Sequence, residues 1–417
     1  MKGLVRLVGP MVLWLVLVGA APAAPVELKF LNFASTEEIY KPIYKVIEDF
    51  EKANPDIKIK NMPIGVGEIR NQFMVMTLGG NAPDVVQLHI GDAVTMLTMG
   101  AIIPAEELYP KAFIDSFFEV FYREGLWGDK HAAVLWGPNT LTFVVNKKLL
   151  KQLGFNAPPK TLDEMEAMMK KGKETIPDLV GFQLDTTIRT IGFTHQWAFM
   201  NAFQFEPIKG TTVKFNTPGM VQYGEWVRRM IKSGYTLPGK RFGEFRPLAA
   251  QGRVLFAYEG AGHRGQMKAF NKALTDAEYD EIWEVAPLPM GPTGRNFAAP
   301  DDHALVVSKS TKHKEAAAKF VQYLTNSNSA LVKYLDPAGF LPPVKDYKAI
   351  APGTFEDRGR QGSLKYAVPN VVDLPFGPNY VKVGTLVMTA VQEIITTDKP
   401  VKGILDTYQL KLEGAVQ

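Results

Sequence analysis

Polar side chains stand at the ends of apolar strand patterns, where groups that bind or transform a small molecule commonly lie in α/β proteins. The run 85–90 is apolar on both faces, as in a strand covered by helices on both sides. His89, Gly91 and Asp92 stand at its end. A histidine and a carboxylate in such a place could act as acid and base, ligate a metal, or hydrogen-bond a ligand.

The sequence offers little support for nucleophilic catalysis or for a transition-metal site. The chain has no cysteine and no Gly-x-Ser-x-Gly motif. Its six histidines are scattered, without His-x-His or His-Glu-x-x-His spacing, so we expect no metal and no cofactor. Paired carboxylates for glycoside hydrolysis are defined by distance in space, so a secreted glycoside hydrolase stays open as an alternative.

The patterns that must position these groups alternate between strand and helix. Residues 26–30 alternate as a strand, residues 39–50 carry apolar side chains at helical spacing, and residues 57–60 alternate again. Pro42 conflicts with one continuous helix, so the sequence predicts a separate first turn or a later helix start. This order predicts an α/β fold with a doubly wound sheet.

The same alternation continues along the chain. Strands are predicted at 131–136, 141–146, 253–260 and 303–309, and helices at 162–169 and 316–324. Breaker residues at Gly137 and Pro138, and in the Pro- and Gly-rich stretch 286–302, predict chain crossings between domains. The length of 417 residues favours two domains over one.

The N-terminus predicts export. A basic start is followed by an apolar run, residues 8–18, and then by small residues and prolines. These are the regions of a secretory signal peptide, which we place at residues 1–24. A membrane anchor is the alternative, but the apolar run is shorter than the ~20 residues that a spanning helix needs. The lack of cysteine excludes a lipid-modified N-terminus, so we expect a soluble protein in a periplasm.

The charge pattern excludes one large class of partners. The chain has 47 Lys and Arg residues against 43 Asp and Glu residues, and no dense basic run. The footprint of a nucleic-acid-binding protein is therefore missing. After the signal, no apolar stretch is long enough to span a membrane. We expect a small-molecule ligand and no nucleic-acid partner.

A series of segments, taken in order, carries a resemblance to a known family. The segments are FEKANPDIKIK, LGGNAPDVVQL, MGAIIPAEEL, LTFVVNKKLLKQLGFNAPPKTLDEM, AAQGRVLFAYEG, HALVVSKSTKHKEAAAKFVQYLT and AGFLPP. Together they resemble the extracellular solute-binding proteins of ABC importers, in the branch that includes maltose-binding and other sugar-binding proteins. The resemblance covers nearly the whole mature chain. It implies a periplasmic-binding-protein-like fold: two α/β lobes with a hinge and an interlobe ligand cleft.

The resemblance also implies a domain division and a function. Lobe one is expected at residues 25–136 plus 302–336, and lobe two at 137–301 plus 337–417. The protein is expected to be a monomer without enzymatic activity. It would capture a sugar or oligosaccharide in the cleft and deliver it to the membrane permease subunits of an ABC importer. Ligand would close the lobes about crossings near Gly137, 286–302 and Pro337.

A sugar-binding cleft needs aromatic faces that pack on the ring, and carboxylates or amides that hydrogen-bond its hydroxyl groups. From lobe one, the strand ends and the resemblance give these ligand-binding candidates: Asn32, Ser35, Glu38, His89, Asp92, Asp302 and His303. Ser35 with Glu38 also fits a helix capping box, and His89 also fits a solvated turn. Asp302 and His303 stand where the family commonly has two glycines, so they would narrow or specialise the cleft.

The remaining candidates come from the first crossing and from lobe two: Trp136, Asn139, Trp197, Tyr258, Glu259 and Tyr380. Trp136, directly before the crossing, is expected to stack on the ligand, with hinge packing as the alternative. Trp197 also fits a helix core. The arginines leave an acidic sugar or a phosphorylated polyol open as the ligand, because Arg makes bidentate pairs with anions. These are Arg70, Arg189, Arg241, Arg246 and Arg264.

Overall fold

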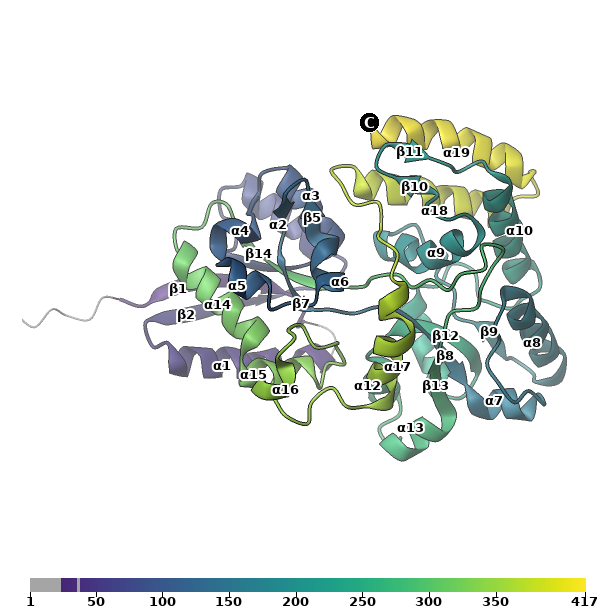
Figure 1. Ribbon diagram of the computed structural model, residues 1–417, viewed down its shortest axis with the longest axis horizontal. Helices are drawn as coiled ribbons and strands as arrows, with labels where there is room; N and C mark the ends of the chain where they lie inside the picture. Colours follow the sequence, from purple (N-terminus) through teal and green to yellow (C-terminus); the bar gives the residue numbers. More distant parts are fainter. Residues whose placement is uncertain (1–23, 36–37) are drawn as a thin grey trace, which may run out of the picture.

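The computed structural model describes residues 24–35 and 38–417, and it has two lobes, each built on its own sheet (Figure 1). The expected signal peptide, apart from its last residue, lies outside the described residues. Strands and helices alternate along both lobes, so the predicted two-lobed α/β fold is confirmed.

The sheet of lobe one has the strand order β2-β1-β3-β14-β4, and β7 also pairs with β14. Its strands are β1 (Val26–Asn32), β2 (Ile57–Pro63), β3 (Val85–His89), β4 (Ile102–Ile103), β7 (Val134–Gly137) and β14 (His303–Ser308). β1 runs parallel to β2 and β3, whereas β14 runs antiparallel to β3, β4 and β7. β14 thus enters the middle of the sheet from lobe two and places His303 opposite His89.

Helices cover both faces of this sheet because its strands are apolar on both sides (Figure 1). α1 (Ile43–Ala53) and α14 (Lys314–Asn326) pack on one face, and α2 (Ile69–Leu78) and α3 (Ile90–Thr98) pack on the other. α1 begins directly after Pro42, behind the separate turn η1 (Glu38–Tyr40), so the predicted later start is confirmed. The smaller elements are α4 (Ala105–Leu108), α5 (Lys111–Ile114), α6 (Glu119–Tyr122), η2 (Arg123–Gly125), β5 (Leu126–Trp127), β6 (Lys130–His131), α15 (Asn328–Ala330), η4 (Leu331–Leu335) and α16 (Tyr347–Ile350).

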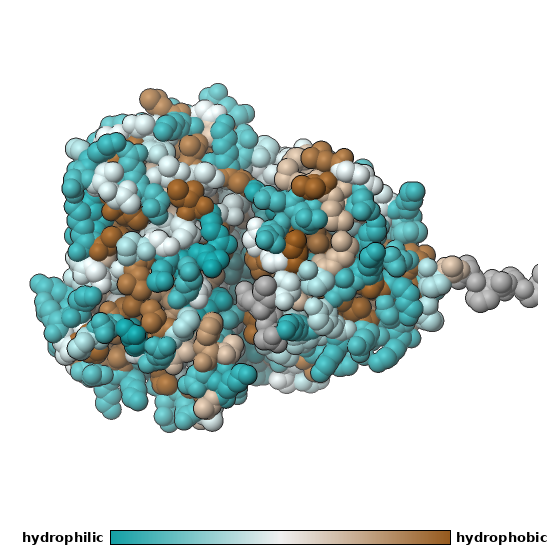
Figure 2. Space-filling view, turned by 180° about the vertical axis from the view of Figure 1, so that it is seen from behind, coloured by the Kyte–Doolittle hydropathy of each residue, from teal (hydrophilic) through white to brown (hydrophobic). Residues whose placement is uncertain are grey.

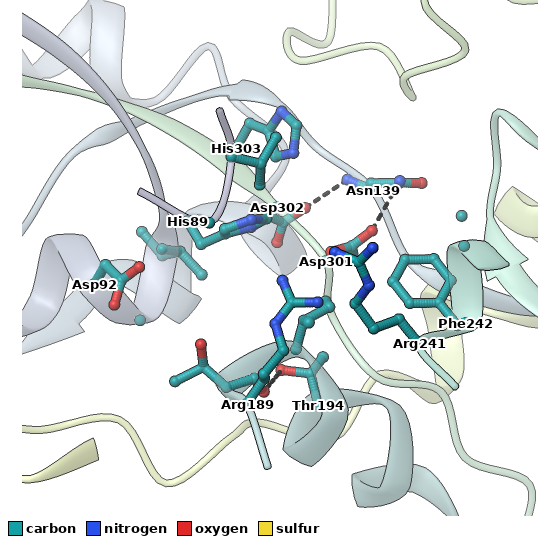
Figure 3. A pocket seen from close by; sticks show the side chains of 18 of the residues that line it. His89, Asp92, Asn139, Arg189, Thr194, Arg241, Phe242, Asp301, Asp302 and His303 are labelled. Atoms are coloured by element: carbon teal, nitrogen blue, oxygen red, sulfur yellow. Dashed lines mark hydrogen bonds between the residues drawn. The ribbon is translucent and has the colours of Figure 1, made fainter. Parts of the chain in front are cut away.

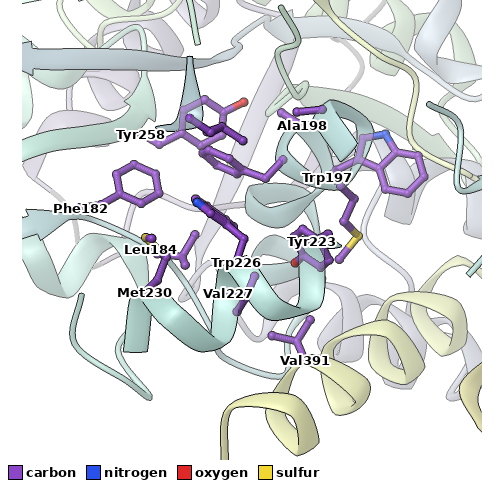
Figure 4. Close-up of a cluster of buried hydrophobic side chains, with 14 of the residues drawn as sticks. Phe182, Leu184, Trp197, Ala198, Tyr223, Trp226, Val227, Met230, Tyr258 and Val391 are labelled. Carbon is purple, nitrogen blue, oxygen red and sulfur yellow. The ribbon is translucent and has the colours of Figure 1, made fainter. Parts of the chain in front are cut away.

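Lobe two has a sheet with the order β13-β8-β12-β9: β13 (Trp283–Ala286), β8 (Leu141–Asn146), β12 (Val254–Gly260) and β9 (Val180–Phe182). Its larger core includes Trp226 and Tyr223 (Figure 4), and the long helices of this lobe pack around it. They are α8 (Leu162–Thr175), α9 (Thr190–Phe203), α10 (Pro218–Lys232), α18 (Tyr380–Thr396) and α19 (Val401–Val416). The other elements are α7 (Lys147–Gln152), β10 (Ile208–Lys209), β11 (Thr212–Val213), η3 (Phe242–Phe245), α11 (Arg246–Ala250), α12 (His263–Phe270), α13 (Asp276–Ile282), α17 (Arg358–Tyr366) and η5 (Val368–Asn370).

The chain crosses between the lobes at three places. Residues 138–140 join β7 to β8, and residues 287–302 join β13 to β14. The third crossing differs from the expected one at Pro337, because apolar side chains from Ala338 to Phe355 belong to the core of lobe one. α17 then packs on β13 of lobe two, so this crossing lies between Phe355 and Arg358.

Candidate functional site

A cavity of about 1240 Å³ lies between the lobes and is lined by residues of both. The space-filling view shows the molecule hollowed between its two masses (Figure 2). Among the predicted ligand-binding residues, the following line the cavity: Ser35, His89, Asp92, Asn139, Glu259, Asp302, His303 and Tyr380. The side chain of Glu38 lies outside the described residues.

Two neutral histidines form part of the lobe-one wall. The register of β14 against β3 pairs His303 with His89, and their rings meet edge to face with centroids 5.1 Å apart. Gln87 Nε2 donates to His303 Nδ1 at 3.0 Å. Burial, and then the charge of Arg189, lower the pKa of His89 to about 4, and burial and His89 lower the pKa of His303 as well. At neutral pH this wall offers imidazole nitrogens without positive charge.

Asp92 lies in the first turn of α3, because that helix begins immediately after β3 rather than after a loop. Its Oδ1 is 3.9 Å from Nε of Arg70 in α2. Burial raises the pKa of Asp92 to about 6, although the charge of Arg70 acts in the opposite direction. The buried carboxyl group lines the cavity, and a group of this kind can accept a hydrogen bond from a hydroxyl.

Asp302 and Asn139 tie the first two crossings together. The backbone N–H of Asn139 donates to Asp302 Oδ1 at 2.5 Å, and Asn139 Nδ2 donates to Asp301 Oδ2 at 3.4 Å (Figure 3). Glu124 is buried behind Asp302, and burial raises the pKa of both carboxyl groups, that of Asp302 to about 6. The charge of Asp302 adds to burial in raising the pKa of Glu124.

Lobe two presents a fixed ion pair. Arg246 donates to Glu259 twice, from Nε to Oε1 at 2.9 Å and from Nη2 to Oε2 at 3.1 Å, and Gln183 Nε2 also donates to Oε1 at 2.8 Å. Burial alone would raise the pKa of Glu259, but Arg246 holds it below its usual value. The predicted residue Glu259 therefore orients Arg246 at the cavity wall.

The lobes touch at one end of the cleft. A Cβ atom on Gly91 in α3 would lie 2.5 Å from Cε1 of Tyr380 and 2.6 Å from Cε1 of Phe376. Thr95 Oγ1 of α3 also donates to the Gly377 carbonyl at 3.3 Å. The close contact between α3 and the start of α18 is thus possible only because residue 91 is a glycine without a side chain.

Trp136 does not line the cavity, so the expectation that it stacks on the ligand is wrong. Only 1 % of the residue is exposed, and its ring stacks on Tyr334 with centroids 4.8 Å apart and an 18° angle. Val134 and Trp136 point into one core of lobe one, whereas Leu135 between them points into the other. The alternation of side chains along β7 therefore sends the indole away from the cleft.

Three further candidates are also buried away from the cavity. Asn32 Nδ2 donates to Asn61 Oδ1 at 2.5 Å, and its Oδ1 accepts from the Ala34 N–H. Trp197 Nε1 donates to the Asp373 carbonyl, and the Tyr258 hydroxyl accepts from the Ala299 N–H. Both rings lie in the core of lobe two (Figure 4), because each satisfies its polar atom there.

Several cavity-lining residues were not among the predicted site residues. Besides the predicted Tyr380, aromatic side chains in the lining come from Tyr40, Phe242, Phe270, Phe340 and Phe376. Four of the arginines noted in the sequence also line the cavity: Arg70, Arg189, Arg241 and Arg246. Figure 3 shows the side chains of Arg189 and Arg241 extending into it. The sequence marked these four arginines only by their residue type, since none of them stands at a strand end.

Two absences hold for residues 24–35 and 38–417. No group of three or more His, Asp or Glu side chains there could hold a metal ion. Nor does this part of the chain contain a helix long and apolar enough to cross a membrane.

Known proteins share both the sequence pattern and the fold. The family model described as bacterial extracellular solute-binding protein matches residues 45–358. The multiple sugar-binding protein of Streptococcus mutans is 25% identical over 334 residues, which are 75% of this chain and 74% of that protein. A solute-binding protein of an ABC transporter from Thermotoga lettingae, bound to alpha-D-tagatose, is 19% identical with a TM-score of 0.81, over 94% of this chain and 100% of that one. A maltose-bound protein of T. maritima is 20% identical with a TM-score of 0.81, over 93% and 99%. The match of the family model over most of the chain, together with the two-lobed fold, means that this protein belongs to the family of bacterial extracellular solute-binding proteins.

Proposed function

We propose that the protein is the substrate-binding component of an ABC-type importer. It captures a sugar or oligosaccharide between its lobes and delivers it to membrane permease subunits. The observation that carries this proposal is the interlobe cavity, lined by polar and aromatic side chains from both lobes in a member of this family. The name of the S. mutans protein supports a sugar as the ligand, and that of the T. lettingae protein supports a role in an ABC importer.

The lining suits a carbohydrate. Asp92, Asn139 and the neutral histidines supply hydrogen-bonding groups, and Tyr40 and Phe242 supply flat apolar faces. A cavity of about 1240 Å³ exceeds the roughly 300–1,000 Å³ of common small-ligand pockets, so it has room for more than one sugar ring.

The ligand acts by bridging the lobes. A sugar that contacts both walls binds the closed arrangement better than an open one, so it shifts the population toward closure about the three crossings. Permease subunits can then distinguish loaded from empty protein by shape. We propose that the protein works as a monomer in the periplasm after loss of residues 1–24, without cofactor and without chemistry on the ligand.

A thermal-shift screen of mono- and oligosaccharides tests this proposal, with calorimetry for each hit. Binding should raise the melting temperature, leave the sugar intact, and reduce the radius of gyration in small-angle scattering. Release of reducing ends would instead favour the glycoside hydrolase. Binding without any change in scattering would contradict closure.

A further inference from the structure

Most of the charged groups that line the cavity are paired. Arg246 is held by Glu259, Arg241 Nε lies 3.4 Å from Glu244 Oε2, and Arg70 lies beside Asp92. The Asp302 carboxylate accepts a hydrogen bond from the backbone N–H of Asn139 and lies beside Glu124. These carboxylates therefore have partners within the protein.

Arg189 is different. Among the residues that the structure describes, its guanidinium group forms neither an ion pair nor a hydrogen bond. The carboxylate with the largest effect on its pKa is Asp185, whose oxygens already accept from the N–H and Oγ1 of Thr187 and from the N–H of Phe242. A guanidinium group with five donors thus faces the cavity without a partner.

Burial and the charge of Arg241 lower the pKa of Arg189, whereas Asp185 and Glu244 raise it, but the carboxylates of Asp185 and Glu244 accept hydrogen bonds from other groups. In Figure 3 its side chain reaches toward the middle of the cavity from lobe two, and that of Arg241 extends into the same space. Nη2 of Arg189 lies 4.0 Å from the position of a Cβ atom on Gly67, in the lobe-one loop that leads into α2. His89 beyond it is neutral. Two guanidinium groups thus face one space, and an anionic ligand would give Arg189 the ion pair that it lacks.

We propose, resting on the proposed function, that the saccharide bound in this cleft carries an anionic substituent, a carboxylate or a phosphate ester, held by Arg189 with Arg241. The planar fork of a guanidinium group matches both anions through two parallel hydrogen bonds. Because Arg189 reaches lobe one from lobe two, the anion would also connect the two walls.

Calorimetry with matched ligand pairs tests this proposal: galacturonate against galactose, glucuronate against glucose, their short oligomers, and glucose 6-phosphate. We expect an acidic member to bind at least about tenfold tighter than its neutral parent. Arg189→Gln should lose about ten- to a hundredfold in affinity for that acid, the range for a hydrogen bond to a charged group, and change the neutral parent less than about twofold. Arg253→Gln, which removes an equally positive but remote side chain, is the matched control and should bind the acid as wild type does.

The outcomes separate the two proposals. If neutral sugars alone bind, the importer function stands and the anionic substituent is refuted. If no sugar binds, charged or neutral, the proposed function fails and this inference fails with it. Tight binding of the acid by Arg189→Gln would also refute the role of Arg189. The melting temperature of unliganded Arg189→Gln should equal or exceed that of wild type, whereas a large fall would mean that Arg189 is structural.

Discussion

Replacing Gly91 with alanine should weaken ligand binding because it holds the two lobes apart. The new Cβ atom would lie 2.5 Å from the Tyr380 ring and 2.6 Å from the Phe376 ring. An ordinary carbon–carbon contact is about 3.5–4.0 Å, so α3 and the start of α18 must separate by roughly 1 Å. Tyr380 has little freedom to turn aside, because it is buried against Phe193 and its hydroxyl group lies 3.3 Å from Thr194 Oγ1.

This steric clash destabilises the closed arrangement of the lobes. Overpacking of a fitted contact costs about 1–3 kcal/mol, and an unliganded protein can avoid most of it by opening. Because ligand binds both walls only when the lobes are closed, the affinity should fall by roughly 5- to 150-fold. Calorimetry with the sugar found by screening measures this loss.

A matched control separates closure from a general effect of glycine replacement. Gly403 lies in α19, and a Cβ atom there would meet nothing within 4 Å. Gly403→Ala should bind ligand as wild type does and gain up to ~1 kcal/mol of unfolding free energy from helix propensity. If Gly91→Ala keeps full affinity and contracts normally in small-angle scattering, the α3–α18 contact is no part of the liganded state and the reasoning is wrong.

Three other expectations follow from the same structure. Trp136→Ala should lower the unfolding free energy in urea by about 3–5 kcal/mol, because the ring lies in a core. The affinity of the folded protein for ligand should stay within about twofold, and a tenfold loss would mean that Trp136 contacts the ligand. Glu124→Gln should gain stability relative to wild type as the pH rises from about 4.5 to 7. Burial and Asp302 raise the pKa of Glu124, so above pH ~4.3 the unfolded wild type releases a proton that the folded protein still holds, and wild type loses stability as the pH rises. Denaturant unfolding at several pH values checks this, and a difference independent of pH would contradict it. N-terminal sequencing of the exported protein should begin between about Ala21 and Val26, whereas an intact Met1 would disprove cleavage.

Local patterns were enough to predict the α/β class, whereas the two-lobed arrangement was implied by the family resemblance. The apolar spacing at Ile43, Val46, Ile47 and Phe50 predicted α1, and Pro42 explains where it starts. The doubly apolar run at β3 predicted a sheet covered on both faces. Such patterns depend only on residues a few positions apart, so they can be recognised in a single sequence.

The cavity could be predicted only in part, because it depends on which side of a strand faces the other lobe. Along β12, Tyr258 points into the core and Glu259 points to Arg246, yet both stand at the same predicted strand end. Trp136 has the composition of a sugar-stacking residue, but the alternation along β7 buries it. Arg189 carries no local signal, since its position at the cavity depends on how two lobes are placed.

The position of β14 has a consequence for the way the chain reaches its native state. The strand pairs with β3, β4 and β7 in the middle of the lobe-one sheet, and it joins Gln87 to His303 across 216 positions of sequence. Lobe one therefore cannot complete its sheet until nearly three quarters of the chain has been synthesised. Contacts of such long range slow folding, because the intervening loop must close before they form. The export that we propose would benefit from such a delay, because a chain that has not completed its sheet can still be threaded through a translocation channel.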